Sequence, residues 1–370
     1  MTAVGSGRAA PVACSACGSD AMARVVFGEP RADDSLEADL RAGRAILGGC
    51  TVDDIDVVHY RCLTCGQGTG RDGPVGQGPF VVKLEPRVVD AEWIVARLAL
   101  MGSAASGKPG RRTVAARRWT LELALRALAE AHTRATFLVM PAGFLKGSIP
   151  AGTAMSRGWG TDPADFARLG PLAEGIVREL VDDKVRALAA GTVSYLVIGV
   201  DLYTRPGPEP HGELAVVHDV RLGTTAAVTG KSFPTGRQER VLVRNVSVDS
   251  HLVPLGGHRA AVLVCHDLMA WGNRSTHNRR GRRAQVATDL VSAVADATVA
   301  LHLPHTVSTS AWTNPWRRFR EGHPGLQGWG SAILHRTTDD QAVGTPPAAT
   351  LLRATGGRDH GSLAIIVGDS

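Results

Sequence analysis

The chain is poor in lysine and in aromatic residues. Only five of its 41 basic side chains are lysines, and Phe, Trp and Tyr make up 5% of its 370 residues. The excess of arginine accompanies abundant Ala, Gly and Val, a bias that indicates genome composition rather than a nucleic-acid surface. Acidic residues nearly balance the basic ones and stacking aromatics are few, which disfavours nucleic-acid binding. The scarcity of lysine makes each lysine position informative.

Long apolar runs are also missing. No stretch approaches the roughly 20 apolar residues of a membrane-spanning helix. The first fourteen residues, MTAVGSGRAAPVAC, lack the apolar core of a secretory signal. The six cysteines are not distributed like a secreted disulfide framework. We therefore expect a cytoplasmic, reduced protein with no membrane partner.

Four of the cysteines form two Cys-x-x-Cys pairs, Cys14 with Cys17 and Cys62 with Cys65. The two-residue spacing lets both thiolates of a tight turn face one ion, and two such turns complete a tetrahedral site. A glycine follows the second cysteine of each pair and permits the positive φ that such a turn needs. The pattern predicts a structural zinc site, with iron or a redox dithiol as the alternatives.

The two pairs lie far apart for a minimal zinc ribbon, so an inserted segment is expected between them. Residues 33–43, DDSLEADLRAG, predict a short helix there, and Cys50 is interpreted as a packed cysteine rather than a fifth ligand. With CSACGSDAMARVVFGEP and YRCLTCG, the first 68 residues resemble a small bacterial zinc-ribbon module. The resemblance implies no particular activity, although such a module could dock a protein partner.

A glycine-rich stretch separates this module from the rest of the chain. Residues 66–79 read GQGTGRDGPVGQGP, a composition typical of a linker. The domains expected are a zinc-ribbon domain over residues 1–70, a linker over 71–88 and a larger domain over 89–370.

Helices alternate with apolar strands through the larger domain, which predicts an α/β fold with a mostly buried sheet. The expected strands are 92–101, 135–140, 193–201, 213–220, 224–229, 239–248, 258–265, 297–303, 331–335 and 362–367. The expected helices are 112–134, one that begins after Asp162 and is interrupted near Gly170 before ending at Gly191, and 282–295. The strands 213–220 and 224–229 are expected to form a hairpin.

The stretch 259–274, RAAVLVCHDLMAWGNR, combines an apolar run with an abrupt polar turn after Cys265. A cysteine at the carboxyl end of a buried strand lies where α/β proteins place reactive groups. The alternative is that Cys265 only fills the core, since free cysteine is among the most buried residue types.

Three motifs follow one another along the chain: TFLVMPAGFL, then GKSFPTGRQE after the hairpin, and then VLVCHDLMAW. Over about residues 90–370 the chain resembles the nitrilase (carbon–nitrogen hydrolase) superfamily. The resemblance implies an αββα sandwich and a homo-oligomer. It also implies a cysteine nucleophile, a lysine that stabilises the oxyanion and a glutamate general base, often helped by a second glutamate.

Matched residue by residue, the resemblance assigns the nucleophile to Cys265, the catalytic lysine to Lys231 and the second glutamate to Glu239, eight residues beyond Lys231. Asp267 matches an acid of the family motif, and we interpret it as a turn-stabilising group. The first glutamate is missing, because its position in PAGF is held by Ala142.

Alanine can neither accept a proton from the thiol nor relay one to a leaving amine, tasks worth about 10²–10⁴-fold. Three outcomes stay open. Glu239 takes the acid–base role, or Lys231 and a helix N-terminus generate the thiolate without a base, or the site is inactive.

The function predicted is therefore a thiol-dependent hydrolase or amidase acting on a non-peptide carbon–nitrogen bond of a small amide-like substrate, without a catalytic cofactor. The alternative is a catalytically inactive binding or regulatory protein of the same fold. A zinc-ribbon nucleic-acid-binding protein is the lesser alternative.

The remaining candidates are weaker. His302 and His305 follow a buried strand in LHLPH, so packing or pocket lining is expected rather than metal binding. Loops over residues 143–161 and 308–328 are expected to set specificity. Three tryptophans are interpreted as a pocket wall or subunit contact: Trp312, Trp316 and Trp329.

Overall fold

The structure, a computed structural model, divides the chain into two compact units, Met1–Gly78 and Pro79–Ser370. In the second unit it describes residues 80–86, 90–101, 111–204, 210–235, 238–272, 281–305, 309–335, 348–357 and 361–369. In the first unit it describes residue 42 and four short strands.

The strands of the first unit form one sheet in the order β2-β1-β3-β4. They are β1 (Met22–Val26), β2 (Ala45–Leu47), β3 (Tyr60–Cys62) and β4 (Gly68–Thr69). Apart from residue 42, the helix expected at residues 33–43 lies outside the described residues, as do Cys14, Cys17, Cys50 and Cys65. Of Cys62 only the backbone is described. The zinc site therefore stays a prediction.

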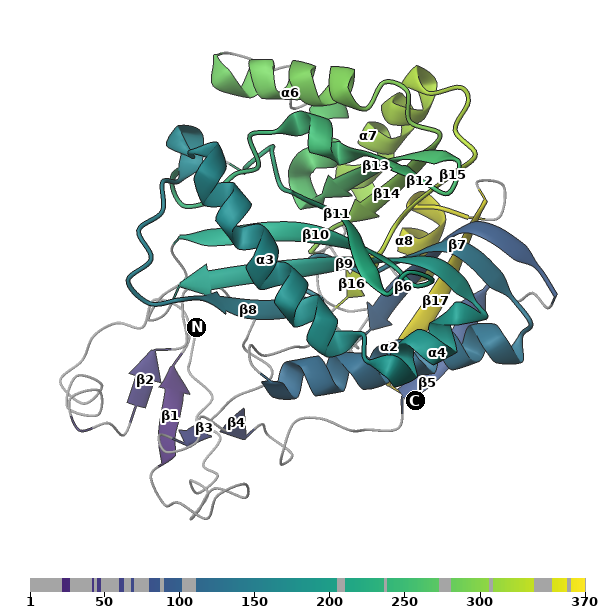
Figure 1. Cartoon of the computed structure of the whole chain (residues 1–370), viewed down its shortest axis with the longest axis horizontal. Helices are drawn as coiled ribbons and strands as arrows, with labels where there is room; N and C mark the ends of the chain where they lie inside the picture. The colour runs from purple at the N-terminus through teal and green to yellow at the C-terminus, as the bar shows by residue number, and fades with distance from the viewer. Residues whose placement is uncertain are drawn as a thin grey trace, which may run out of the picture. The chain divides into compact units, whose positions relative to one another are not determined.

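The second unit is built on a large mixed sheet in the order β11-β10-β9-β7-β6-β17-β5, with β8 paired to β9 and β16 to β6 (Figure 1). Its strands are β5 (Phe80–Glu85), β6 (Glu92–Met101), β7 (Arg134–Val139), β8 (Leu145–Ile149), β9 (Val193–Thr204), β10 (His211–Asp219), β11 (Thr224–Gly230), β16 (Ile333–His335) and β17 (Ser362–Asp369). The pairs β6–β7 and β7–β9 are parallel, whereas β9–β10 and β10–β11 are antiparallel.

A smaller sheet in the order β12-β13-β14-β15 packs against the large one. Its strands are β12 (Leu252–Leu255), β13 (His258–Val264), β14 (Val299–Leu303) and β15 (Gly328–Ser331). The central pair β13–β14 is parallel, so the carboxyl ends of these two strands lie side by side.

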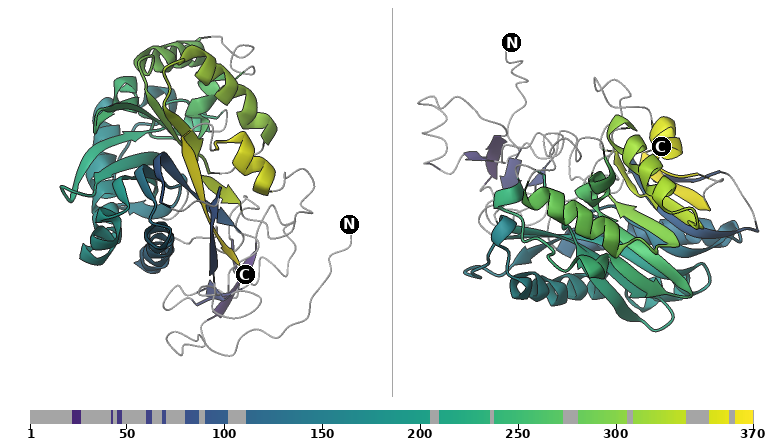
Figure 2. Two further views of the ribbon diagram at one scale, coloured as in Figure 1. Left: turned by 90° about the vertical axis from the view of Figure 1, so that its right-hand side faces the viewer. Right: turned by 90° about the horizontal axis from the view of Figure 1, so that it is seen from above.

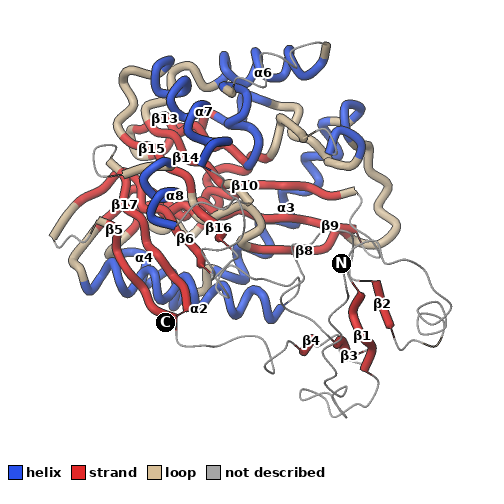
Figure 3. Tube along the Cα trace, turned by 180° about the vertical axis from the view of Figure 1, so that it is seen from behind, coloured by secondary structure: helices blue, strands red, loops and turns tan. Residues whose placement is uncertain are grey.

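Helices cover the outer face of each sheet, as the two further views show (Figure 2). The large sheet carries α2 (Arg111–Glu130), α3 (Pro163–Leu180) and α4 (Asp183–Ala190). The small sheet carries α6 (Arg282–Ala293) and α7 (Thr309–Gly322), and α8 (Ala348–Ala354) lies beside α7 (Figure 3). A third apolar core, which includes Phe137, Val197 and Val262, fills the space between the sheets. The result is an α/β fold in which two mixed sheets pack face to face.

Apolar periodicity predicted most of these elements. The strand expected at 92–101 is confirmed residue for residue as β6, and the hairpin is confirmed as the antiparallel pair β10–β11. The helix expected after Asp162 begins at Pro163, and the Asp162 carboxylate accepts a hydrogen bond from the Ala164 amide as its N-cap.

Three expectations were wrong. Helix α3 runs through Pro171 without a break, because its apolar face, including Leu169 and Val177, is buried against the sheet. Residues 239–248 form no strand beyond a single bridge from Leu242; the short 3₁₀ helix η4 (Gln238–Arg240) begins this segment instead. The expected loop 308–328 contains α7.

None of the helices in the part of the chain that the structure describes is both long and apolar enough to cross a membrane.

Candidate active site

Cys265 lies where β13 ends and the 3₁₀ helix η6 (Cys265–Trp271) begins. Its φ of +50° falls in the left-handed region, which non-glycine residues enter at a cost of order 1–3 kcal/mol. The side chain is 6% exposed. A strained residue of this kind persists only when its surroundings hold it there, and two buried side chains do so.

The first is Asp267, whose carboxylate is fully buried two residues after the cysteine. It accepts hydrogen bonds from the backbone amides of Ser232 at 2.9 Å, Phe233 at 2.7 Å and Val264 at 3.0 Å. These bonds tie the turn after β13 to the segment that follows Lys231. The interpretation of Asp267 as a turn-stabilising acid is confirmed by these contacts.

The second is His302, at the carboxyl end of the neighbouring strand β14. Its Nε2 lies 2.7 Å from the carbonyl oxygen of Cys265, and its Nδ1 lies 2.8 Å from the hydroxyl of Ser331. Burial lowers the pKa of His302 to about 3, so the ring is neutral and can donate only through Nε2. The expected packing role of His302 is confirmed.

The expectation that the three tryptophans form a pocket wall or subunit contact was wrong. They are at most 4% exposed and belong to the core between the small sheet and its helices. Trp316 Nε1 donates to the Ser331 hydroxyl at 2.9 Å. Trp312 packs on the rings of His266 and His302. The tryptophans therefore pack behind the turn that contains Cys265, through their contacts with His266, His302 and Ser331.

Lys231 follows β11 and is 1% exposed. Its Nζ lies 2.8 Å from Oε2 of Glu213, a residue of β10 that is 4% exposed. The hairpin register places the two residues together, because the Lys231 amide donates to the Glu213 carbonyl at 2.9 Å. The Glu213 carboxylate also accepts a hydrogen bond from Gln238.

The charges of this pair stabilise one another. Burial favours the neutral form of Lys231, but the Cys265 and Glu213 charges outweigh burial and raise the pKa of the ammonium above its ordinary value. Burial alone would raise the pKa of Glu213, whereas Lys231 and His305 hold it well below its usual range. Both groups are charged at neutral pH.

His305 lies two residues after β14 and pairs with Asp201 of β9. Its Nε2 is 2.9 Å from Oδ2 of Asp201, and its Nδ1 is 3.6 Å from Oε2 of Glu213. The hydroxyl of Tyr203 donates to the same Asp201 oxygen at 3.0 Å. Asp201 is 1% exposed, whereas 23% of the His305 side chain is exposed. His305 and His266, whose Nδ1 lies 3.2 Å from Cys265 Sγ, are thus two partly exposed groups beside the thiol.

Cys265 Sγ, a ring nitrogen of His305 and a carboxylate oxygen of Glu213 all lie within 4.8 Å of one another. Burial raises the pKa of the Cys265 thiol, but the charges of Lys231 and His305 and a contact with His266 hold it well below its usual range. Burial would lower the pKa of His305, whereas Asp201, Glu213 and the thiolate raise it well above its usual value. Both shifts favour a thiolate beside an imidazolium.

Sulfur, imidazole and carboxylate are also ligands that zinc accepts. In this cluster, however, the ammonium of Lys231 already lies 2.8 Å from the Glu213 carboxylate and interacts with Cys265. A dication bound there would face a buried positive charge at close range. The donor set therefore fits thiolate chemistry better than a metal centre.

Ala142, the position at which the sequence resemblance predicts a glutamate, belongs to the same apolar core as Cys265. Ala142 is fully buried in the core between the sheets, and Gly143 after it has a φ of +65°. A Cβ on Gly143 would lie 2.7 Å from Oδ2 of Asp201 and 3.3 Å from Cδ2 of His305. The His305–Asp201 pair is therefore packed directly against the turn that contains Ala142 and Gly143.

Of the three predicted catalytic residues, Cys265 and Lys231 are brought together and interact electrostatically. Glu239 lies in η4 and forms an ion pair with Arg283, 3.4 Å from its Nε. The neighbouring residue Gln238, rather than Glu239, is the one that contacts Glu213.

Sequence reasoning missed Glu213 and Asp201 as members of the site, and it named His305 only as a packing or pocket-lining residue. The hairpin register held a signal for Glu213, because extending the pairing of Leu214 with Gly230 by one step brings Glu213 opposite Lys231. The pairing of β9 with β10 then places Asp201 beside Glu213. His305 was recognisable only as a polar residue just after a buried strand.

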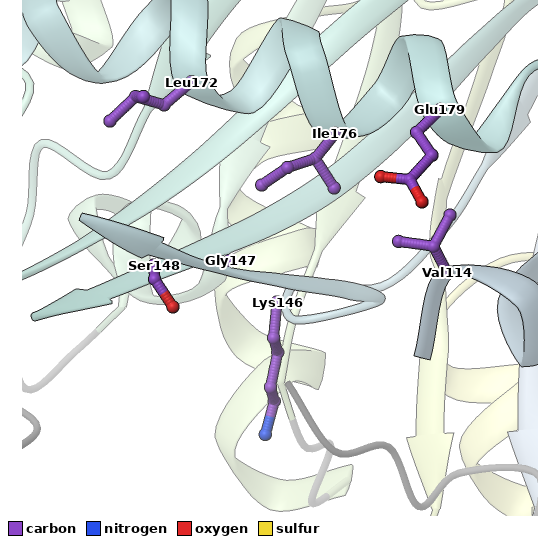
Figure 4. A pocket seen from close by; sticks show the side chains of 7 residues that line it. All are labelled: Val114, Lys146, Gly147, Ser148, Leu172, Ile176 and Glu179. Atoms are coloured by element: carbon purple, nitrogen blue, oxygen red, sulfur yellow. The ribbon is translucent and has the colours of Figure 1, made fainter. Parts of the chain in front are cut away.

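A separate pocket of about 230 Å³ lies between β8 and the helices α2 and α3 (Figure 4). Its lining residues are Val114, Lys146, Gly147, Ser148, Leu172, Ile176 and Glu179. None of these is a member of the Cys265 cluster, so the pocket is not part of the candidate active site.

No family model matches the chain, and no curated protein matches it. Solved structures do. One is a mutant of the amidase from Nesterenkonia sp. AN1 with acrylamide added at its active-site cysteine. It is 19% identical to this chain, with a TM-score of 0.32. The match covers 56% of this chain and 66% of that chain, just under two thirds of its length. Another is a mutant of the Nesterenkonia AN1 amidase from the nitrilase superfamily: 17% identity, TM-score 0.37, over 67% and 78% of the two chains. A third is a carbon–nitrogen hydrolase from Helicobacter pylori G27: 13% identity, TM-score 0.34, over 63% and 69%. The chain is thus structurally similar, over part of its length, to nitrilase-superfamily amidases and carbon–nitrogen hydrolases.

Proposed function

We propose that the second unit is a thiol-dependent hydrolase that cleaves a non-peptide carbon–nitrogen bond of a small amide. Cys265 is the nucleophile and Lys231 stabilises the oxyanion. The single observation that carries the proposal is the Cys265 thiol itself. It is held at a strained φ of +50° at the end of a strand, among buried charges that hold its pKa well below its usual range.

The chemistry follows from these two groups. The Cys265 thiolate attacks the amide carbonyl carbon, the carbon–sulfur bond forms, and the carbonyl π electrons move onto oxygen. The buried ammonium of Lys231 stabilises that negative charge, and an ammonium in a water-poor site does so far more effectively than in bulk water. As the intermediate collapses, an acidic group of the site protonates the nitrogen, the carbon–nitrogen bond breaks and the amine leaves a thioester behind. Water then hydrolyses the thioester, which returns the proton to that group and releases a carboxylic acid and the Cys265 thiolate.

Glu213 supports the lysine in this proposal. A carboxylate 2.8 Å from Nζ fixes the direction of the ammonium and keeps it protonated. The catalytic role predicted for Glu239 stays a prediction. Because Glu239 pairs with Arg283, we assign the role of supporting Lys231 to Glu213.

The test is selective alkylation of Cys265 by chloroacetamide, an electrophilic amide, in the folded full-length protein. We expect modification at pH 7 at a rate at least about tenfold above that of the urea-denatured chain, because an ordinary thiol of pKa about 8.5 is only a few per cent thiolate there. Peptide mass spectrometry separates Cys265 from the five other cysteines. A folded protein whose Cys265 stays unmodified at pH 8 would overturn the proposal.

One observation favours a second candidate function. Ala142 stands where the resemblance requires the general base, so an inactive protein that binds an amide without turning it over is the alternative. In that case chloroacetamide modifies Cys265, but the acyl-enzyme formed with an activated ester persists rather than being hydrolysed.

For the first unit we propose a structural zinc ion held by its two cysteine pairs. Native full-length protein is expected to contain about one equivalent of zinc by elemental analysis, and the double variant Cys62→Ser/Cys65→Ser to contain none. Cys50→Ser is the matched control and should retain the metal. Native protein with well under one equivalent would contradict the proposal.

A further inference from the structure

The cluster around Cys265 contains a proton carrier that the sequence motifs do not reveal. His305 joins Cys265 from β14, the strand that runs parallel to β13, and Asp201 joins them from β9 of the facing sheet. We propose that His305, positioned by Asp201, is the general acid and base of the site and replaces the glutamate that is absent at Ala142. The inference rests on the proposed hydrolase function.

Geometry carries the argument. His305 presents Nε2 to Asp201 at 2.9 Å, and Nδ1 lies 3.6 Å from Glu213, so the ring has one committed nitrogen and one that faces the cluster. Asp201 fixes the orientation of the ring, as the third member of a nucleophile–base–carboxylate arrangement does. Because Asp201 acts through His305, it is a positioning residue.

Location supports the same assignment. The His305–Asp201 pair packs against Gly143, the residue after Ala142. It therefore lies next to the position at which the resemblance predicts the glutamate. Glu213 is a poorer candidate for proton transfer. It already serves Lys231 and Gln238, and its charge is strongly stabilised by Lys231.

The proposed steps balance. The Cys265 thiolate attacks while His305 is an imidazolium, and His305 then gives its proton to the leaving nitrogen as the carbon–nitrogen bond breaks. The neutral imidazole accepts a proton from water as the water oxygen attacks the thioester carbon. The carbon–sulfur bond breaks, the thiolate and the imidazolium are restored, and the products are one carboxylic acid and one amine.

Two substrates of the same acyl group separate acid catalysis from structural damage. Nitrophenolate leaves from 4-nitrophenyl acetate without a proton, whereas the nitrogen of 4-nitroacetanilide must be protonated to leave. In His305→Gln, acylation of Cys265 by the ester at pH 9 should stay within about threefold of wild type. Acylation by the anilide should fall by about 10²–10⁴-fold, the usual contribution of general acid–base catalysis. Asp201→Asn should show the same pattern with a smaller loss, and the exposed His132→Gln is the control.

The pH profile of Cys265 alkylation by iodoacetamide supplies a second readout. The groups facing the thiol are Lys231, Glu213, His266 and His305. Loss of the imidazolium in His305→Gln should move the midpoint of the profile upward by about one pH unit or more. Asp201→Asn should weaken the imidazolium and move it in the same direction.

The outcomes are distinguishable. Equal losses on ester and anilide, or no loss on either, together with an unmoved alkylation midpoint, would overturn the role of His305 and leave the hydrolase proposal intact. A wild-type protein that neither substrate acylates would overturn the hydrolase proposal, and the alkylation profile would then still report whether His305 and Cys265 form an ion pair.

Discussion

Replacing Lys231 with methionine is expected to lower kcat/KM for an amide substrate by about 10²–10³-fold, the usual effect of removing one oxyanion-stabilising group. The same change should lower the free energy of unfolding by about 3–5 kcal/mol, because it removes the nearer of the two cations that face the buried Glu213 carboxylate. Chemical denaturation and steady-state kinetics on the full-length protein measure the two effects.

The two effects separate in a matched double variant. Lys231→Met/Glu213→Gln removes both charges, so most of the lost stability should return while the activity stays low. Glu239→Gln is the second control, since its ion pair with Arg283 is partly exposed and pairs of that kind contribute at most about 1 kcal/mol. Full activity in the double variant would contradict the oxyanion role, and a large loss of activity in Glu239→Gln would restore Glu239 to the site.

Replacing Asp267 with alanine is expected to have the second large effect. Three backbone amides, those of Ser232, Phe233 and Val264, would lose their acceptor in a buried position. Each unsatisfied buried donor costs about 1–3 kcal/mol, so the unfolding free energy should fall by at least about 3 kcal/mol. The turn that holds Cys265 at positive φ should relax, and alkylation of Cys265 should slow toward the rate of an ordinary thiol.

Asp267→Asn is the informative comparison. Its amide oxygen can still accept from Ser232 and Phe233, which share Oδ1 of the aspartate, whereas its amide nitrogen would face the Val264 amide. We expect an intermediate stability and an intermediate alkylation rate. If alanine and asparagine both matched wild type in denaturation and alkylation, the carboxylate would not be the group that holds the turn.

The position of Cys265 was predictable because its signal is local. An apolar run that ends in a polar turn predicts a strand with a reactive group at its carboxyl end. Strand β13 ends at Val264, directly before Cys265, as that pattern requires. Lys231 was predicted from the resemblance, which matches it to a lysine that follows a hairpin, and the rarity of lysine in this chain supported the match. The signal for Cys265 thus lies within a few residues, whereas that for Lys231 came from a motif.

The segment 239–248 shows why local patterns fail. Its alternating apolar residues favoured a strand, and Leu242 and Val243 are indeed buried. The backbone nevertheless starts as a 3₁₀ helix at Gln238–Arg240, and the Asn245 amide donates to the Lys231 carbonyl instead of to a regular ladder. The pattern of apolar residues indicates which side chains face inward. The hydrogen-bond partners of the backbone, however, depend on the tertiary structure.

By itself, the sequence determined the alternation of helices and strands and identified Cys265 and Lys231 as candidate site residues. Only the tertiary structure decided which groups surround them. Asp201 and His305 are 104 residues apart and meet because β9 and β14 lie in facing sheets. A spacing of that length carries no periodic signal. The pairing of His305 with Asp201 therefore follows only from the packing of the two sheets.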